Sequence, residues 1–243
     1  RFGFKLNSFQ FKDKSGLELK ELAVNTQLNQ NGIALNDIRL KVNNSLLFAD
    51  LKLNYKTLQD FIKSPESAQF DFKVKDVQVD IADAYLFSPE LKDNPNFKAL
   101  TKYKFTGDLR FAGNLEELQI PQFDLNWGDN TSLTFSGNLS QITDVDSLGV
   151  NLKNYAFKSS KVDMGEFIQE DSLGVSIPQS LVLEGQFQKN VDVFSTQSKL
   201  QIPEGIIDLQ GNFSNTTTIE YALNLDVNSL KLGDILQNPA IGE

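Results

Sequence analysis

Apolar and polar residues alternate along most of the chain. In one stretch Phe70, Phe72 and Val74 alternate with Asp71 and Lys73. A period of two places one set of side chains on one face of a β-strand and the other set in water. Roughly 14 such segments occur, separated by turn signals, whereas helical spacing occurs only in short pieces. The pattern therefore predicts an all-β protein whose strands each have one apolar face.

In eight segments the alternation slips by one residue in the middle, as apolar-x-apolar-x-x-apolar-x-apolar. An uninterrupted strand would then turn its second pair of apolar side chains to the wrong face. Either a β-bulge or a two-residue hairpin restores the face. None of the inner pairs contains the glycine that tight hairpins favour, so we favour a bulge. Bulges at the same place in many strands would bend the whole sheet into a trough. The segments begin at Phe4, Leu17, Ile33, Leu46, Phe72, Leu118, Val150 and Leu225.

A second motif, apolar-x-Gly-x-(Leu/Phe), recurs at Gly107, Gly137, Gly185 and Gly211. Glycine inside a strand marks a kink or a close approach by a neighbouring segment. Four copies of one frame favour a structural repeat over four unrelated strand glycines.

A third motif ends a strand with a short run that carries two adjacent apolar residues. Its copies are Val79–Leu86, Val162–Ile168 and Leu230–Leu236. Each predicts one or two helical turns that cover an open end or rim of the sheet. Together the repeats predict one elongated β-repeat segment over residues 1–243, with loose sub-units at about 1–63, 68–168 and 177–243.

Composition excludes several classes of function. The 243 residues carry 23 Lys+Arg against 32 Asp+Glu, a formal charge of −9, which argues against binding of nucleic acid. Histidine and cysteine are absent, which excludes His-based triads, cysteine nucleophiles, disulfides and zinc sites built on either residue. Close acidic pairs such as Asp144 with Asp146 are better explained as turn residues than as calcium ligands or glycosidase carboxylates. We therefore predict no enzymatic activity, no metal and no cofactor.

No apolar run is long enough to cross a membrane. The longest are four residues, Leu46–Ala49 and Ala84–Phe87, whereas a spanning helix needs roughly 20. Because the sequence also begins at Arg1 and not at Met, we expect it to be a piece of a longer protein, with any membrane anchor outside it.

Four stretches resemble the TamB-like branch of the AsmA-like proteins, as found in Bacteroidetes-type bacteria. They are residues 77–91, residues 107–137 with Asn-Leu-Glu-Glu-Leu after Gly113, residues 177–187 and residues 232–242. Members of that family are anchored in the inner membrane and extend through the periplasm as an antiparallel sheet folded into an apolar trough, a β-taco. The resemblance implies a periplasmic part of an inner-membrane-anchored envelope protein. It also implies phospholipid acyl chains and an Omp85-type outer-membrane barrel as partners, the barrel through a C-terminal region outside this sequence.

The trough should be lined by apolar side chains that share one face of each strand. With the resemblance, this predicts a groove that shields acyl chains while phospholipid moves between the two membranes. The expected lining residues are Phe105, Leu109, Phe111, Phe123, Leu125, Trp127, Leu133, Phe135, Leu139, Leu181, Leu183 and Phe187.

Two alternative functions stay open. A scaffold or chaperone for outer-membrane proteins would receive their strands at an unprotected sheet edge by β-augmentation. An adhesin would be a closed β-sandwich with a filled core and an exposed patch of Tyr and Trp. An open apolar interior favours the lipid conduit, and a free edge strand favours the scaffold.

Overall fold

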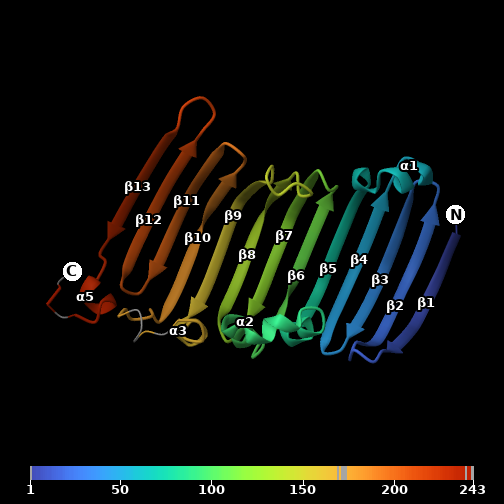
Figure 1. Cartoon of the computed structure of the whole chain (residues 1–243), viewed down its shortest axis with the longest axis horizontal. Coiled ribbons are helices and arrows are strands. Elements are labelled where there is room, and N and C mark those ends of the chain that lie inside the picture. Colours follow the sequence, from blue (N-terminus) through green and yellow to red (C-terminus); the bar gives the residue numbers. More distant parts are fainter. Residues whose placement is uncertain (1, 169, 171–173, 239, 242–243) are drawn as a thin grey trace. The chain divides into compact units, whose positions relative to one another are not determined.

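The computed structural model describes residues 2–168, 170, 174–238 and 240–241, and over these residues the chain is all-β. Thirteen strands follow one another in sequence order in one antiparallel sheet, which is not closed (Figure 1). The predicted all-β class is confirmed. The strands form one sheet, whereas a β-sandwich would have two sheets packed face to face. The strands are β1 (Phe2–Lys12), β2 (Glu18–Asn29), β3 (Gly32–Val42), β4 (Ser45–Asn54), β5 (Gln69–Asp80), β6 (Lys104–Gly113), β7 (Glu117–Trp127), β8 (Thr131–Ser140), β9 (Gly149–Ser160), β10 (Ser180–Lys189), β11 (Val193–Ile202), β12 (Gly205–Ser214) and β13 (Glu220–Asn228).

The chain divides into two compact units, which we describe separately. The N-terminal unit comprises Arg1–Leu125 with Leu139–Thr143, and the C-terminal unit comprises Asn126–Asn138 with Asp144–Glu243. Strands β1–β6 lie in the first unit and β9–β13 in the second. The finer division at about 1–63, 68–168 and 177–243 stays a prediction.

Short helices follow β5, β9 and β13, where the third motif predicts them. They are η2 (Ile81–Leu86), α3 (Lys161–Met164) and α5 (Leu232–Ile235). Side chains cap the first two, because Asp80 accepts a hydrogen bond from the N–H of Ala82 and Ser160 accepts one from the N–H of Asp163. In the N-terminal unit, the connections at the strand ends also hold α1 (Leu58–Lys63), η1 (Pro65–Ser67), η3 (Pro89–Asp93) and α2 (Pro95–Leu100) (Figure 1).

Register shifts show which strands bulge. Along the β3–β4 ladder Leu35 pairs with Leu51 and Ile38 with Ala49, so β3 holds one extra residue. Shifts of the same kind place a bulge in β1, β2, β5 and β9. The bulge interpretation is confirmed in these five strands. Strand β7 also runs unbroken through its slip, which excludes a hairpin there.

The bulges of β3 and β5 share one construction. Asp37 and Asp76 each take a φ of 54°, in the left-handed region that Asp tolerates better than most residues. The N–H of each donates to a carboxylate of the next strand, Asp50 at 2.9 Å and Asp108 at 3.0 Å. An aspartate on the following strand therefore holds the extra residue in place.

The bulge interpretation is wrong for β4 and for the last copy of the motif. Strand β4 has no extra residue of its own, so Ala49 lies opposite Ile38 while Phe48 lies on the other face of the sheet. There the ring of Phe48 packs under the guanidinium of Arg39, 5.1 Å from the ring centre. In the last copy β13 already ends at Asn228, so the slip belongs to the end of a strand.

Three of the four motif glycines pack directly against the main chain of the next strand. A Cβ atom at these positions would overlap a carbonyl oxygen, so only glycine fits. At Gly211 the nearest atoms would be side-chain carbons at 3.4 Å and beyond, an ordinary contact. The close approach is therefore confirmed at three positions and wrong at the fourth. The three pairs are Gly107 with Asp124, Gly137 with Asn151 and Gly185 with Gln197.

Candidate functional site

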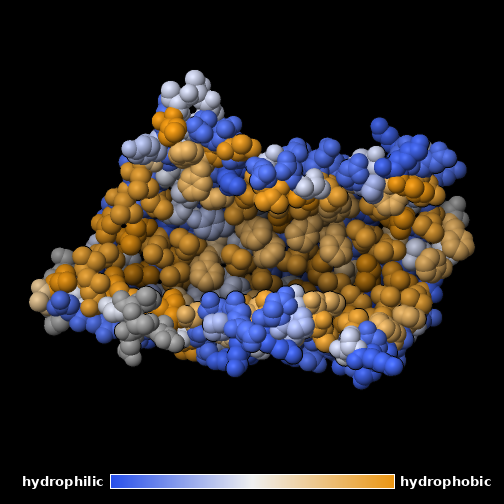
Figure 2. All heavy atoms as spheres, viewed as in Figure 1, coloured by the Kyte–Doolittle hydropathy of each residue, from blue (hydrophilic) through white to orange (hydrophobic). Residues whose placement is uncertain are grey.

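One face of the N-terminal unit is apolar from β1 to β6. Residues that pair across an antiparallel ladder lie on the same face, so the register identifies this face. Val74 of β5, for example, lies between Ala49 of β4 and Leu109 of β6. Figure 2 shows the side chains of these strands as a hydrophobic band between hydrophilic residues at the strand ends. Its members on β3–β6 are Ile33, Leu35, Ile38, Leu40, Leu47, Ala49, Leu51, Leu53, Phe70, Phe72, Val74, Val77, Val79, Phe105, Leu109 and Phe111.

The most buried part of this face lies at the bulges. Ala49, Val74 and Val77 form a buried cluster, with Val74 only 2% exposed. Larger side chains around the cluster, such as Phe72 and Leu109, are only partly buried. Among the described residues no second sheet covers them. The side chains in the middle of the strands are therefore buried, while the larger side chains around them stay partly exposed to solvent.

The structure places the expected lining residues of this unit on the apolar face where the register is defined. Phe105, Leu109 and Phe111 of β6 pair with Val79, Val74 and Phe72 of β5. Phe123, Leu125 and Leu139 are half-buried at alternating positions of β7 and β8. The apolar row of β5 was not among the expected lining residues, although its alternation is the clearest in the chain.

The C-terminal unit has an apolar face of its own across β9–β13. Leu183 of β10 pairs with Phe157 of β9 and with Leu200 of β11. Leu200 in turn pairs with Ile207 of β12, which pairs with Val227 of β13. The expected residues Leu181, Leu183 and Phe187 belong to this face, whereas most of its members on the other four strands were not singled out. These further members include Val150, Leu152, Tyr155, Phe157, Phe194, Leu200, Ile202, Ile207, Leu209, Phe213, Tyr221, Leu223, Leu225 and Val227.

Strands β7 and β8 contribute to the same face of the C-terminal unit. The ring of Trp127 lies 6.2 Å from that of Phe157. The hydroxyl of Thr131 lies 2.8 Å from that of Ser159, whose ladder partner is Leu181. Because alternate residues share a face, Leu133 and Phe135 follow Thr131 onto it, as the sequence predicts.

A chain of hydroxyl groups crosses the apolar face of the C-terminal unit. The oxygens of Tyr155 and Ser198 are 2.6 Å apart, with Gly185 between the two residues in the ladder. Ser198 lies 2.8 Å from the Thr196 hydroxyl, which donates to the carbonyl oxygen of Gln186. Thr196 has only one proton, so Ser198 must donate to Thr196 and Tyr155 to Ser198. Every hydroxyl proton is used within the protein, and none is free to hold a bound molecule.

Thr26 is a buried polar residue on the apolar face of the N-terminal unit. It pairs with Phe4 and Leu35, is 6% exposed, and its hydroxyl has no hydrogen-bond partner within the described residues. A buried, unsatisfied hydroxyl costs about 1–3 kcal/mol. We therefore expect Thr26→Val to raise the free energy of unfolding by about 1 kcal/mol in urea titrations. As a control, Thr131→Val should lower it, because that hydroxyl donates to Asp163 at 2.7 Å. A loss of stability in Thr26→Val would contradict the assignment.

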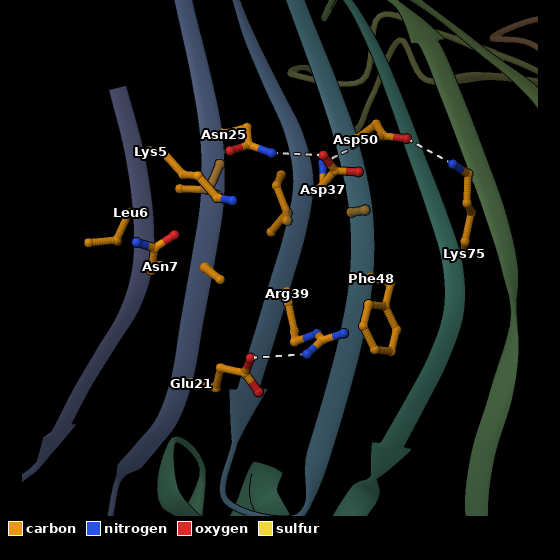
Figure 3. Close-up of a pocket in the computed structure, with 14 residues that line it drawn as sticks. Lys5, Leu6, Asn7, Glu21, Asn25, Asp37, Arg39, Phe48, Asp50 and Lys75 are labelled. Carbon is orange, nitrogen blue, oxygen red and sulfur yellow. Dashed lines mark hydrogen bonds and ion pairs between the residues drawn. The ribbon is translucent and has the colours of Figure 1, made fainter. Parts of the chain in front are cut away.

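The opposite, polar face of the N-terminal unit has a hollow of about 500 Å³ over β1–β5 (Figure 3). The N–H of Asp37 and the ammonium of Lys75 both donate to Asp50, and they lower the pKa of that carboxyl. Each carboxylate of the hollow therefore has a hydrogen-bond or ion-pair partner within the protein. The side-chain pairs are Lys75 with Asp50 (2.9 Å), Asn25 with Asp37 (2.8 Å) and Arg39 with Glu21 (3.4 Å).

Two further observations concern the acidic residues of the chain. Within the described ranges no cluster of three or more Asp or Glu side chains is placed to hold a metal ion. Asp144 accepts hydrogen bonds from the N–H of Asp146 and the hydroxyl of Ser147, as a turn residue does.

No helix in the described part of the chain is both long enough and apolar enough to cross a membrane.

Comparisons with protein-family models, with curated proteins and with solved structures gave no match to this chain.

Proposed function

We propose that this chain is a non-enzymatic carrier segment whose apolar sheet faces shield lipid acyl chains during phospholipid transport between the inner and outer membranes. The observation that carries the proposal is the apolar face of each unit. In the N-terminal unit its centre is buried, while the surrounding Phe and Leu side chains stay partly exposed. A face of this extent is uncommon on a soluble protein unless it contacts an apolar partner.

The energetics favour an acyl chain as that partner. Burying one methylene contributes about 0.8 kcal/mol, so an acyl chain of about 16 methylenes gains roughly 13 kcal/mol on leaving water. Lipid therefore crosses water very slowly without a carrier. An apolar sheet face lowers that barrier by replacing water around the chain.

The surroundings of each face suit a moving ligand. In the C-terminal unit the hydroxyl chain from Tyr155 to Gln186 offers no free proton to an ester group. In the N-terminal unit the opposite face is covered with paired charges, such as Arg110 with Asp71 at 2.9 Å. The first property allows acyl chains to slide, and the second keeps a protein with so much exposed apolar surface in solution.

The resemblance to TamB-like proteins supports a location in the periplasm. On that interpretation an inner-membrane anchor and a region that contacts an Omp85-type barrel lie elsewhere in the protein. The chain would then be the part in which lipid is in transit.

Photo-crosslinking in bacterial cells tests the proposal. A photoreactive benzoylphenylalanine replaces Phe72 in the N-terminal unit or Phe187 in the C-terminal unit, both on apolar faces. Matched controls carry it at the next residue, Lys73 or Gln188, on the opposite face. We expect phospholipid adducts, detected by mass spectrometry, at the two phenylalanine positions and none at the controls.

Two other results would contradict the carrier function. Equal lipid labelling on both faces would show nonspecific contact with membrane. Adducts with outer-membrane proteins and none with lipid would favour the scaffold function instead.

A further inference from the structure

The polar face of the C-terminal unit, opposite its apolar face, has a hollow of about 420 Å³ over β9–β12. Two rows of polar side chains flank it, and each residue of a row is the ladder partner of the next. The first row is Asn151, Gln188, Ser195 and Asn212, and the second is Gln186 and Gln197. Leu152, Phe187 and Thr196 lie between the rows. Because alternate residues point to opposite faces, these three line the hollow with their main chain.

The bulge of β9 adds the charge of this hollow. Tyr155 pairs with Gly185 and Leu152 pairs with Phe187, so β9 holds one extra residue between these two pairs. Lys153 lies in this bulge, lines the hollow and is exposed to solvent. Within the described residues it forms no ion pair, and the other residues that line the hollow are uncharged.

The side-chain amides that flank the hollow are open to a ligand. In the part of the chain that the structure describes, they take part in no hydrogen bond. They belong to Asn151, Gln186, Gln188, Gln197 and Asn212. The hollow of the N-terminal unit differs, because hydrogen bonds and ion pairs within the protein engage its carboxylates. The hollow of the C-terminal unit therefore offers donors and acceptors with a single charge.

This chemistry favours a saccharide as the ligand. A primary amide both donates and accepts hydrogen bonds, as the hydroxyl groups of a sugar do. Protein interfaces centre on aromatic and apolar side chains, but Leu152 and Phe187 direct theirs to the other face. Nucleic acid requires several cations, and the hollow has one. Neighbouring strands are about 4.8 Å apart, so the amides repeat across the strands on the scale of one sugar residue.

We propose that this hollow binds a saccharide chain that runs across β9–β12 and carries a carboxylate beside Lys153. The amides would bind its hydroxyl groups, and the ammonium would bind the carboxylate by a charge-assisted hydrogen bond. Because the aromatic ring of Phe187 lies on the other face, binding would rest on hydrogen bonds, and we expect a dissociation constant of about 1 mM. The inference does not rest on lipid binding, which concerns the opposite face.

Nuclear magnetic resonance of the isotope-labelled chain tests the proposal, because side-chain NH₂ groups give signals of their own. One ligand is chitotetraose, a neutral chain of N-acetylglucosamine. The other is a hyaluronan tetrasaccharide, in which the same sugar alternates with glucuronate. We expect both to shift the NH₂ signals of Gln186 and Gln197, and the hyaluronan tetrasaccharide to bind about fivefold tighter. Lys153→Gln should remove this difference and leave the affinity for chitotetraose unchanged.

Gln197→Ala tests the contribution of the amides. Gln197 lines the hollow, whereas its ladder partner Gln210 has the same side chain on the same face and does not line it. Gln197→Ala should weaken the binding of both saccharides about fivefold, and the control Gln210→Ala should leave it unchanged. Each of these variants also identifies one NH₂ signal by removing it. Main-chain signals away from the hollow check that each variant is folded.

Several results would overturn the proposal. These are unchanged NH₂ signals with both saccharides, equal affinity of the unchanged chain for the two, a preference for hyaluronan that persists in Lys153→Gln, and equal losses in Gln197→Ala and Gln210→Ala. Shifts of the same NH₂ signals when the chain alone is concentrated would show that a second copy of the chain, and not a saccharide, occupies the hollow.

Discussion

Gly185→Ala should lower the free energy of unfolding of the C-terminal unit by about 3 kcal/mol. The new methyl group would overlap the carbonyl oxygen of Gln197 and lie 2.9 Å from the Cα of Ser198. Both obstacles are main chain, so no side-chain rotation removes the overlap. Relief requires β10 and β11 to separate locally, at the point where Tyr155 reaches over Gly185 to Ser198. Urea titration followed by circular dichroism measures the loss.

Gly211→Ala is the matched control. Gly211 stands in the same sequence motif, one strand beyond β11, but a Cβ there would meet only Thr196 Cγ2 at 3.4 Å and Leu223 Cδ1 at 3.7 Å. We expect a change within about 0.5 kcal/mol, because alanine fits and loses less chain entropy on folding than glycine. Equal losses in the two variants would mean that the motif, and not the close approach at Gly185, explains the effect.

The bulges could be predicted because two independent signals agree in most strands. The apolar period slips by one residue, and the inner pair lacks the residues of a tight turn. In β4 the same signal misleads, because Leu46, Leu47, Phe48 and Ala49 are all apolar and the period does not choose between them. Packing decides which of these residues lie on the apolar face. Ala49 lies there between Ile38 and Val74, and the larger Phe48 packs against Arg39 on the polar face.

The candidate site was predictable only in part. Alternation assigns Leu183 and Phe187 to the apolar face once the strands are placed. It does not say whether a second layer covers that face, because a closed sandwich core has the same period. The hydroxyl chain could not be predicted from the sequence either, because Tyr155 and Ser198 meet across an intervening strand and are 43 residues apart in sequence.

The helical turns after β5 and β9 use one device that the sequence motif did not reveal. The third residue of each helical turn is an aspartate. Its carboxylate accepts hydrogen bonds from the hairpin turn between the two strands that come just before β5 or β9 in the sequence. Asp83 accepts hydrogen bonds from the N–H of Asn44 and the hydroxyl of Ser45. Asp163 does the same for the turn between β7 and β8. The short helices therefore tie hairpins together as well as covering strand ends.

Asp163→Ala should cost about 3 kcal/mol of the free energy of unfolding. The carboxylate is 2% exposed and accepts hydrogen bonds from the N–H groups of Asp129 and Asn130 and from the Thr131 hydroxyl, at 2.7–3.0 Å. Alanine would leave all three donors without their charged acceptor. The one tryptophan of the chain, Trp127, precedes this turn and reports its unfolding by fluorescence. Asp83→Ala is the control, with a smaller loss expected because Asp83 is less buried.

The loss of unfolding free energy in Asp163→Ala should become smaller as the pH falls. Burial alone would raise the pKa of Asp163, but the hydrogen bonds from Asn130, Asp129 and Thr131 outweigh it and lower the pKa. A carboxyl with a lowered pKa in the folded state contributes its full stability above its unfolded pKa, about 4. The contribution disappears as the pH falls through the folded value. Wild type and Asp163→Ala should therefore differ most near pH 7 and converge below about pH 4. A difference that stays constant down to pH 2 would show that the side chain acts through packing and not through its charge.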